Sequence, residues 1–96
     1  MEFVDLQGAS GQVYRFRRWP DGGCHPPIAG NFAVLRRNDR ELVALGVSEN
    51  LAEAHPELGR LESGLDAFTR LNVSRAHREA EHADLSAAHP RSELRT

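Results

Sequence analysis

The sequence predicts a small α+β domain with a central, mainly antiparallel sheet, an extra N-terminal β-hairpin and flanking helices. Two early segments alternate polar and apolar residues, two apolar runs follow them, and the second half carries helical patterns that end at prolines. With 96 residues the chain has the length of one domain. Residues 1–96 are therefore expected to form a single unit, with residues 90–96 as a flexible tail.

The hairpin is expected from residues 2–6 and 12–18, which alternate with a period of two on either side of the turn residues 8–11. Residues 20–27 contain three prolines and two glycines, so they are expected to form a loop.

The centre of the sheet is expected from residues 31–35 and 41–47, because these runs are more continuously apolar than the hairpin. The polar residues 36–40 between them favour a tight connection. A fifth strand is expected at residues 68–73.

Helices are expected after the sheet residues. Ser48 is placed to cap a helix that begins at Glu49, a second short helix is expected over residues 56–63, and Ser74 is placed to cap a last helix over residues 75–89. The last helix carries a stripe of small side chains that is expected to lie close against the sheet: Ala76, Ala80, Ala83 and Ala87.

The composition bears on the class of partner. The formal net charge is −2, whereas a domain that binds nucleic acid nonspecifically is commonly basic. Residues 1–48 hold six arginines against five acidic residues, and residues 49–96 hold six against nine. Any attraction for phosphate is therefore expected from the first half.

The sequence also bears on localisation. No apolar run approaches the roughly 20 residues that cross a bilayer, and no basic segment followed by an apolar one begins the chain. The single cysteine, Cys24, cannot form an internal disulfide. We expect a cytoplasmic protein with no membrane contact.

Metal-ligand and nucleophile patterns are weak. His77 and His82 are five residues apart, whereas a helical zinc pair usually has a spacing of four. Cys24 and His25 are neighbours, and catalytic cysteine and histidine partners are normally distant in sequence. No metal site and no cofactor are expected.

Candidate partner-binding residues lie in the first half. Arg15 and Arg17 are expected on the outer face of the hairpin, and an exposed Trp19 beside them would suit either base stacking or a protein interface. Arg36 and Arg37 extend this basic surface.

Three segments resemble a known family. Gly30-Asn31-Phe32, Ala44-Leu45-Gly46 and the helix start at residues 48–54 are similar, in order and spacing, to the two motifs and first helix of the GIY-YIG nuclease superfamily. The resemblance covers roughly residues 2–90. It implies that fold, in a branch of short bacterial proteins that begin with an extra hairpin.

The resemblance also implies that the reaction has been lost. Phe32, Ala44 and Ala54 stand where the family has tyrosine, tyrosine and arginine, and the metal-binding glutamate corresponds to His82 or, shifted by one residue, Glu81. These replacements lack the groups that activate water and hold the phosphate. No catalytic residue is therefore expected.

The expected function is a noncatalytic protein-binding module on a degenerate GIY-YIG scaffold. It would serve as a small regulator or inhibitor, for example a phage-encoded inhibitor of a bacterial defence complex. The alternatives are a nucleic-acid-binding domain that uses the arginine face and, third, a residual metal-dependent nuclease.

Overall fold

A computed structural model describes residues 3–19, 26–53, 64–89 and 93–95. The elements, in chain order, are β1 (Phe3–Gln7), β2 (Val13–Arg18), β3 (Gly30–Arg36), β4 (Leu42–Ser48), β5 (Leu65–Leu71), α2 (Arg75–Ala88) and β6 (Glu93–Arg95). The strands form one sheet in the order β1-β2-β5-β3-β4-β6, in which only the β4–β6 pair is parallel. An α+β domain with a mainly antiparallel sheet that begins with a hairpin is therefore confirmed.

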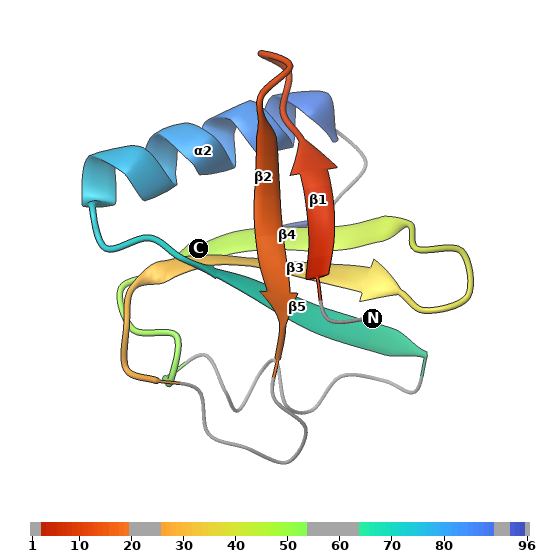
Figure 1. Cartoon of the computed structure of the whole chain (residues 1–96), viewed down its shortest axis with the longest axis horizontal. Coiled ribbons are helices and arrows are strands. Elements are labelled where there is room, and N and C mark those ends of the chain that lie inside the picture. Colours follow the sequence, from red (N-terminus) through yellow and green to blue (C-terminus); the bar gives the residue numbers. More distant parts are fainter. Residues whose placement is uncertain (1–2, 20–25, 54–63, 90–92, 96) are drawn as a thin grey trace.

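The N-terminal hairpin forms as expected. β1 and β2 pair from Phe3 opposite Arg17 to Gln7 opposite Val13, and Gly11 closes the turn with a φ of 89°. That left-handed conformation favours glycine because it has no Cβ. Figure 1 shows the hairpin crossing the direction of β3, β4 and β5 at a steep angle.

Strand β3 is the centre of the sheet. It pairs with β5 along its whole length and with β4 on its other side, where Val43 is an extra residue between two successive pairs. This bulge changes the face to which the following side chains of β4 point. Strand β5 begins three residues earlier and ends two residues earlier than expected, because its pairing with β3 runs from Leu65 to Leu71.

The sheet has an apolar cluster on each face. The cluster on the α2 side contains Leu6, Tyr14, Phe16, Ala33, Leu35, Leu45, Phe68 and Leu85. The cluster on the opposite face contains Trp19, Phe32, Val34, Ala44, Leu51 and Ala67. Alternation along each strand divides the residues in this way, because successive side chains point to opposite faces.

Helix α2 lies on one side of the central strands (Figure 1). Ser74 caps it as expected, since its hydroxyl accepts a hydrogen bond from the His77 amide at 3.4 Å. The expected contact of the alanine stripe is wrong: Ala76, Ala80, Ala83 and Ala87 are all exposed. The buried residues of the helix are Arg78 and Leu85.

Polar partners on the sheet explain this orientation of α2. Three contacts tie the helix to the strands: Asn31 Nδ2 to the Arg78 carbonyl at 2.9 Å, Arg70 Nε to Glu81 Oε1 at 2.7 Å, and the Tyr14 hydroxyl to Asp84 Oδ2 at 2.8 Å. A helix that turned its alanines inward would take the Arg78 carbonyl away from the buried Asn31 amide, which is costly.

Other expectations need correction or fall outside the described residues. Ser48 is the last residue of β4 instead of a helix cap, and its hydroxyl bonds to the backbone of Asn50, where residues 49–53 form a bend and a turn. The expected helix at residues 56–63 and most of the expected loop at 20–27 lie outside the described residues. Within the expected tail, Glu93–Arg95 pairs with β4 on the side away from β3, so β6 is the edge strand at this end of the sheet.

Candidate functional site

The expected basic surface consists of two hollows that meet at Arg18. Arg15 and Arg17 point away from the α2-side cluster, as alternation predicts, whereas Arg36 and Arg37 lie at the β3–β4 turn. Arg18, at the end of β2, lines both hollows. The sequence indicated these arginines but not that they line two separate hollows.

The first hollow, which we call the outer groove, has a volume of about 370 Å³. Its lining is Phe3, Arg15, Arg17, Arg18, Pro26, Thr69, Arg70 and Leu71. It lies where β2 and β5 separate, since only two residue pairs join these strands, Arg17 with Thr69 and Arg18 with Phe68.

Arg70 links the two strands where their pairing ends. Its Nη1 donates to the Arg15 carbonyl at 3.4 Å, its guanidinium lies 5.5 Å from the centre of the Tyr14 ring, and its Nε meets Glu81. A side-chain donor thus bonds to the Arg15 carbonyl at the point where the backbone pairing of β2 with β5 has ended.

Apolar side chains gather around the outer groove. The large hydrophobic residues that are exposed in the described part of the chain are Phe3, Val13, Leu71 and Val73. Phe3 and Leu71 line the groove, whereas Val13 is the first residue of β2 and Val73 follows β5 by two residues. An exposed apolar group of this kind, bordered by charged residues, is typical of an interaction site.

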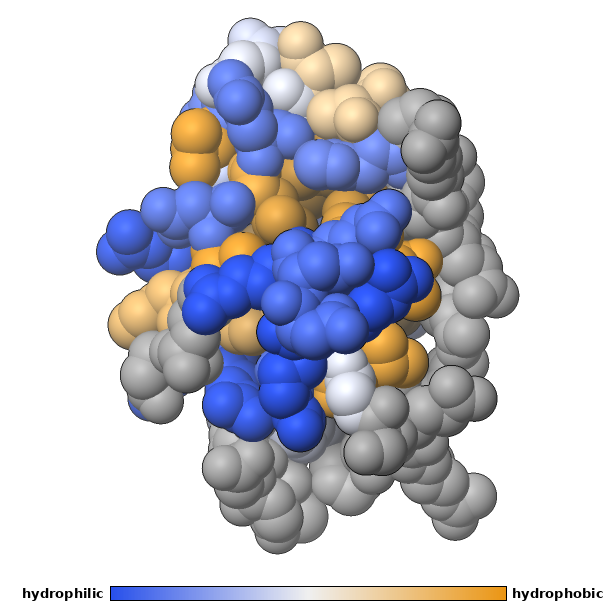
Figure 2. Space-filling model, turned by 90° about the vertical axis from the view of Figure 1, so that its right-hand side faces the viewer, coloured by the Kyte–Doolittle hydropathy of each residue, from blue (hydrophilic) through white to orange (hydrophobic). Residues whose placement is uncertain are grey.

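The second hollow, which we call the turn hollow, lies beside the β3–β4 turn and also measures about 370 Å³. Its charged lining residues are Arg18, Arg36, Arg37, Arg40 and Asp66. Figure 2 views the molecule from the side of this turn and shows hydrophilic side chains gathered there, with hydrophobic ones around them.

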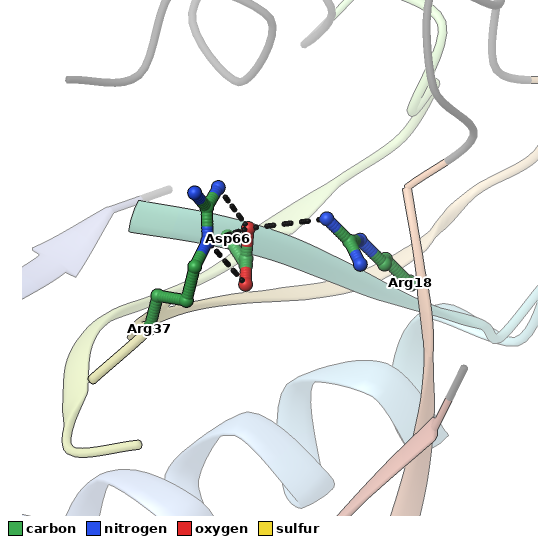
Figure 3. Close-up of polar contacts among 3 residues, drawn as sticks. All are labelled: Arg18, Arg37 and Asp66. Carbon is green, nitrogen blue, oxygen red and sulfur yellow. Dashed lines mark hydrogen bonds and ion pairs between the residues drawn. The ribbon is translucent and has the colours of Figure 1, made fainter. Parts of the chain in front are cut away.

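Asp66 joins two of these arginines (Figure 3). Its Oδ1 accepts from Arg37 Nη2 at 2.8 Å and from Arg18 Nη2 at 3.4 Å. The hydrogen bond from Arg37, assisted by the charge of Arg18, lowers the pKa of Asp66 below its ordinary value of 3.8. The carboxylate therefore stays ionised and holds the two guanidinium groups in place.

Most arginine charge on this surface is already compensated. Arg15 pairs with Asp5 at 2.9 Å, and Arg36 pairs with Asp39 and Glu41 at 3.0 and 3.1 Å. Arg17 differs, because it is exposed in the outer groove and has no ion pair within the described residues. It is the guanidinium most readily available to a partner.

Trp19 does not serve as an exposed anchor. It is 9% exposed, belongs to the cluster on the face opposite α2, and its backbone N–H donates to the Ala67 carbonyl at 2.8 Å. Because the strand alternation ends at Arg18, no local pattern indicates which way the indole points. Burial corrects its assignment as a contact residue.

The family-like positions do not form one cluster. Phe32 and Ala44 pack together on the face opposite α2, and Ala54 lies outside the described residues. His82 is on α2, so the sheet separates it from Phe32 and Ala44; burial lowers the pKa of its imidazole. Glu81 on the same helix is engaged by Arg70.

No protein-family model, curated protein or solved structure matches this chain. Among the described residues, no group of three or more His, Cys, Asp or Glu side chains is arranged to hold a metal ion. The described helix also lacks the length and apolar character needed to cross a membrane.

Some residues that line the outer groove lie outside the sequence predictions. Phe3, Leu71 and Arg70 were not identified from the sequence, although alternation could have placed Phe3 on the same face as Arg17, with which it pairs. Alternation does not indicate a role for Arg70, because its position at the groove depends on the separation of β2 from β5.

Proposed function

We propose that this chain is a noncatalytic protein-binding module that contacts its partner through the outer groove. The observation that carries the proposal is that two exposed large apolar side chains, Phe3 and Leu71, line the outer groove with Arg17, a guanidinium without an ion pair in the described structure. Arginine beside exposed apolar groups is the composition of protein-interface anchors.

The balance of charge supports a protein partner over nucleic acid. A phosphate backbone would have to displace Asp5, Asp66 or Glu81 from Arg15, Arg18 or Arg70 before those guanidinium groups could bind it. The net charge of −2 adds general repulsion.

We further propose that binding is the whole activity, on a scaffold similar to the GIY-YIG nucleases. Support comes from Phe32 and Ala44, which fill an apolar cluster, and from Glu81, which is held by Arg70. A compact binder of this kind would act as a regulator or inhibitor by occupying a partner's surface, for example as a phage-encoded inhibitor of a defence complex.

Affinity capture with matched variants tests the proposal. The full chain would be immobilised as the wild type, as Leu71→Glu and as Arg75→Glu, and proteins retained from a lysate of the native organism would be quantified by mass spectrometry. We expect Leu71→Glu to lose a retained protein that the wild type and Arg75→Glu both keep. The proposal fails if every protein retained by the wild type is also retained by Leu71→Glu.

A nucleic-acid-binding function is the second candidate, because four arginines and one carboxylate line the turn hollow. It predicts binding to single-stranded DNA or RNA that weakens steeply between 50 and 200 mM salt, as phosphate contacts require. Fluorescence anisotropy would measure this. Cleavage of the same probe with magnesium or manganese would instead revive the nuclease alternative.

A further inference from the structure

The outer groove exposes strand backbone as well as side chains. In antiparallel strands the N–H and C=O groups of alternate residues point to the same neighbour. Trp19 N–H donates to Ala67, so the backbone groups of Arg17 and Arg15 also point toward β5. By the same alternation, those of Thr69 and Leu71 point toward β2.

The backbone pairing of β2 with β5 stops before Arg15 and Leu71, and the Arg15 carbonyl accepts instead from Arg70 Nη1 at 3.4 Å. Arg17 pairs with Thr69, but Arg15 and Leu71 lie outside the β2–β5 register. Leu71 pairs with Gly30 of β3 on its other side, so β5 is fixed in place while its edge toward β2 is open. An open strand edge of this kind is a template for an added extended segment.

The side chains around the open edge define what such a segment must carry. Leu71 is 56% exposed and offers an apolar contact, and Phe3 lies on the same groove. Arg17 offers a forked set of donors that matches a carboxylate. The remaining groove arginines have carboxylate partners in the chain, so one acidic side chain suits the site better than a run of them.

We propose that the outer groove binds an extended segment of a partner protein, which adds as a short strand beside Leu71 and places an apolar side chain against Leu71 and Phe3 and a carboxylate on Arg17. This proposal rests on the proposed function and specifies its ligand. Main-chain hydrogen bonds to the strand edge would supply affinity. The acidic and apolar side chains of the segment would supply selectivity.

A random 12-residue peptide library displayed on phage, selected against the immobilised full chain, provides the probe. We expect enriched peptides to pair an aspartate or glutamate with an aliphatic or aromatic residue. A synthetic peptide of the most enriched sequence should lose about ten- to hundredfold in affinity on Arg17→Ala, the scale of one charge-assisted forked contact. Arg75→Ala, an exposed arginine on α2, serves as the matched control and should leave affinity unchanged.

Amide hydrogen exchange of the peptide complex tests the strand addition itself. We expect slower exchange at Leu71 and Arg15 and unchanged exchange along α2. The proposal is overturned if no peptide is enriched, if enriched peptides lack acidic residues, if Arg17→Ala binds as tightly as Arg75→Ala, or if neither Leu71 nor Arg15 gains protection.

The two proposals can fail separately. A lysate protein whose capture depends on Leu71, together with a library that yields no binder, would show that the groove receives a folded surface instead of an extended segment. Capture that is indifferent to Leu71→Glu would remove the proposed function as well.

Discussion

The ion pair between Arg70 and Glu81 should be structural, and its energy can be anticipated from its geometry. The two side chains meet at 2.7 Å and are 32% and 18% exposed. Exposed pairs contribute about 0.2–1 kcal/mol, and removing one member of a fully buried pair costs about 3–5 kcal/mol. We expect Glu81→Gln to lower the free energy of unfolding by an intermediate amount, about 1–2 kcal/mol.

A double-mutant cycle isolates the contact between these residues from their other interactions. Urea unfolding of Arg70→Gln, Glu81→Gln and the double variant should give a coupling energy of about 1 kcal/mol. The control is the Arg75–Glu79 pair on the same helix, which meets at 3.3 Å, is 73% and 57% exposed and should couple by about 0.3–0.5 kcal/mol. A coupling for Arg70 and Glu81 no larger than the control's would refute this reasoning.

Three further outcomes are expected. Ala44→Tyr, which overfills a packed cluster, should lower the free energy of unfolding by about 1–3 kcal/mol. The double variant Phe32→Tyr, Ala44→Tyr should cleave no DNA with magnesium, and cleavage by that variant would contradict the reasoning. The folded state lowers the pKa of Asp66 from 3.8, so its ionisation stabilises the fold above that ordinary value and this contribution is lost as pH falls through the lowered pKa. Thermal unfolding should therefore show Asp66→Asn less stable than wild type at pH 7 and the difference closing as pH falls through the lowered pKa, whereas a constant difference would contradict the assignment. Gly30→Ala should lower the unfolding temperature measured by circular dichroism, because its Cβ would meet the Arg70 carbonyl of β5, and an unchanged temperature would show that the strands can separate there.

Local patterns predicted the parts of the fold that depend on alternation and capping. The hairpin, the outward direction of Arg15 and Arg17, and the cap at Ser74 all follow from neighbours within a few residues. The same patterns located the central strand, because a run buried on both faces is continuously apolar.

What the sequence could not show depends on distant partners. The alanine stripe of α2 is a sound helical pattern, yet polar groups on β3 and β5 determine which face turns inward. Ser48 has the residue type of a cap, but it continues β4 because β3 pairs with it through Gly30. The outer groove arises where two strands diverge, and no local signal marks that separation.

Hydrogen exchange of the chain, free and bound to the protein captured from the native organism, tests the central claim most directly. We expect the partner to slow exchange at residues 13–17 and 71–73 and to leave α2 unchanged. Protection confined to α2, which exposes a stripe of alanines on the other side of the sheet, would contradict the assignment of the outer groove as the binding site.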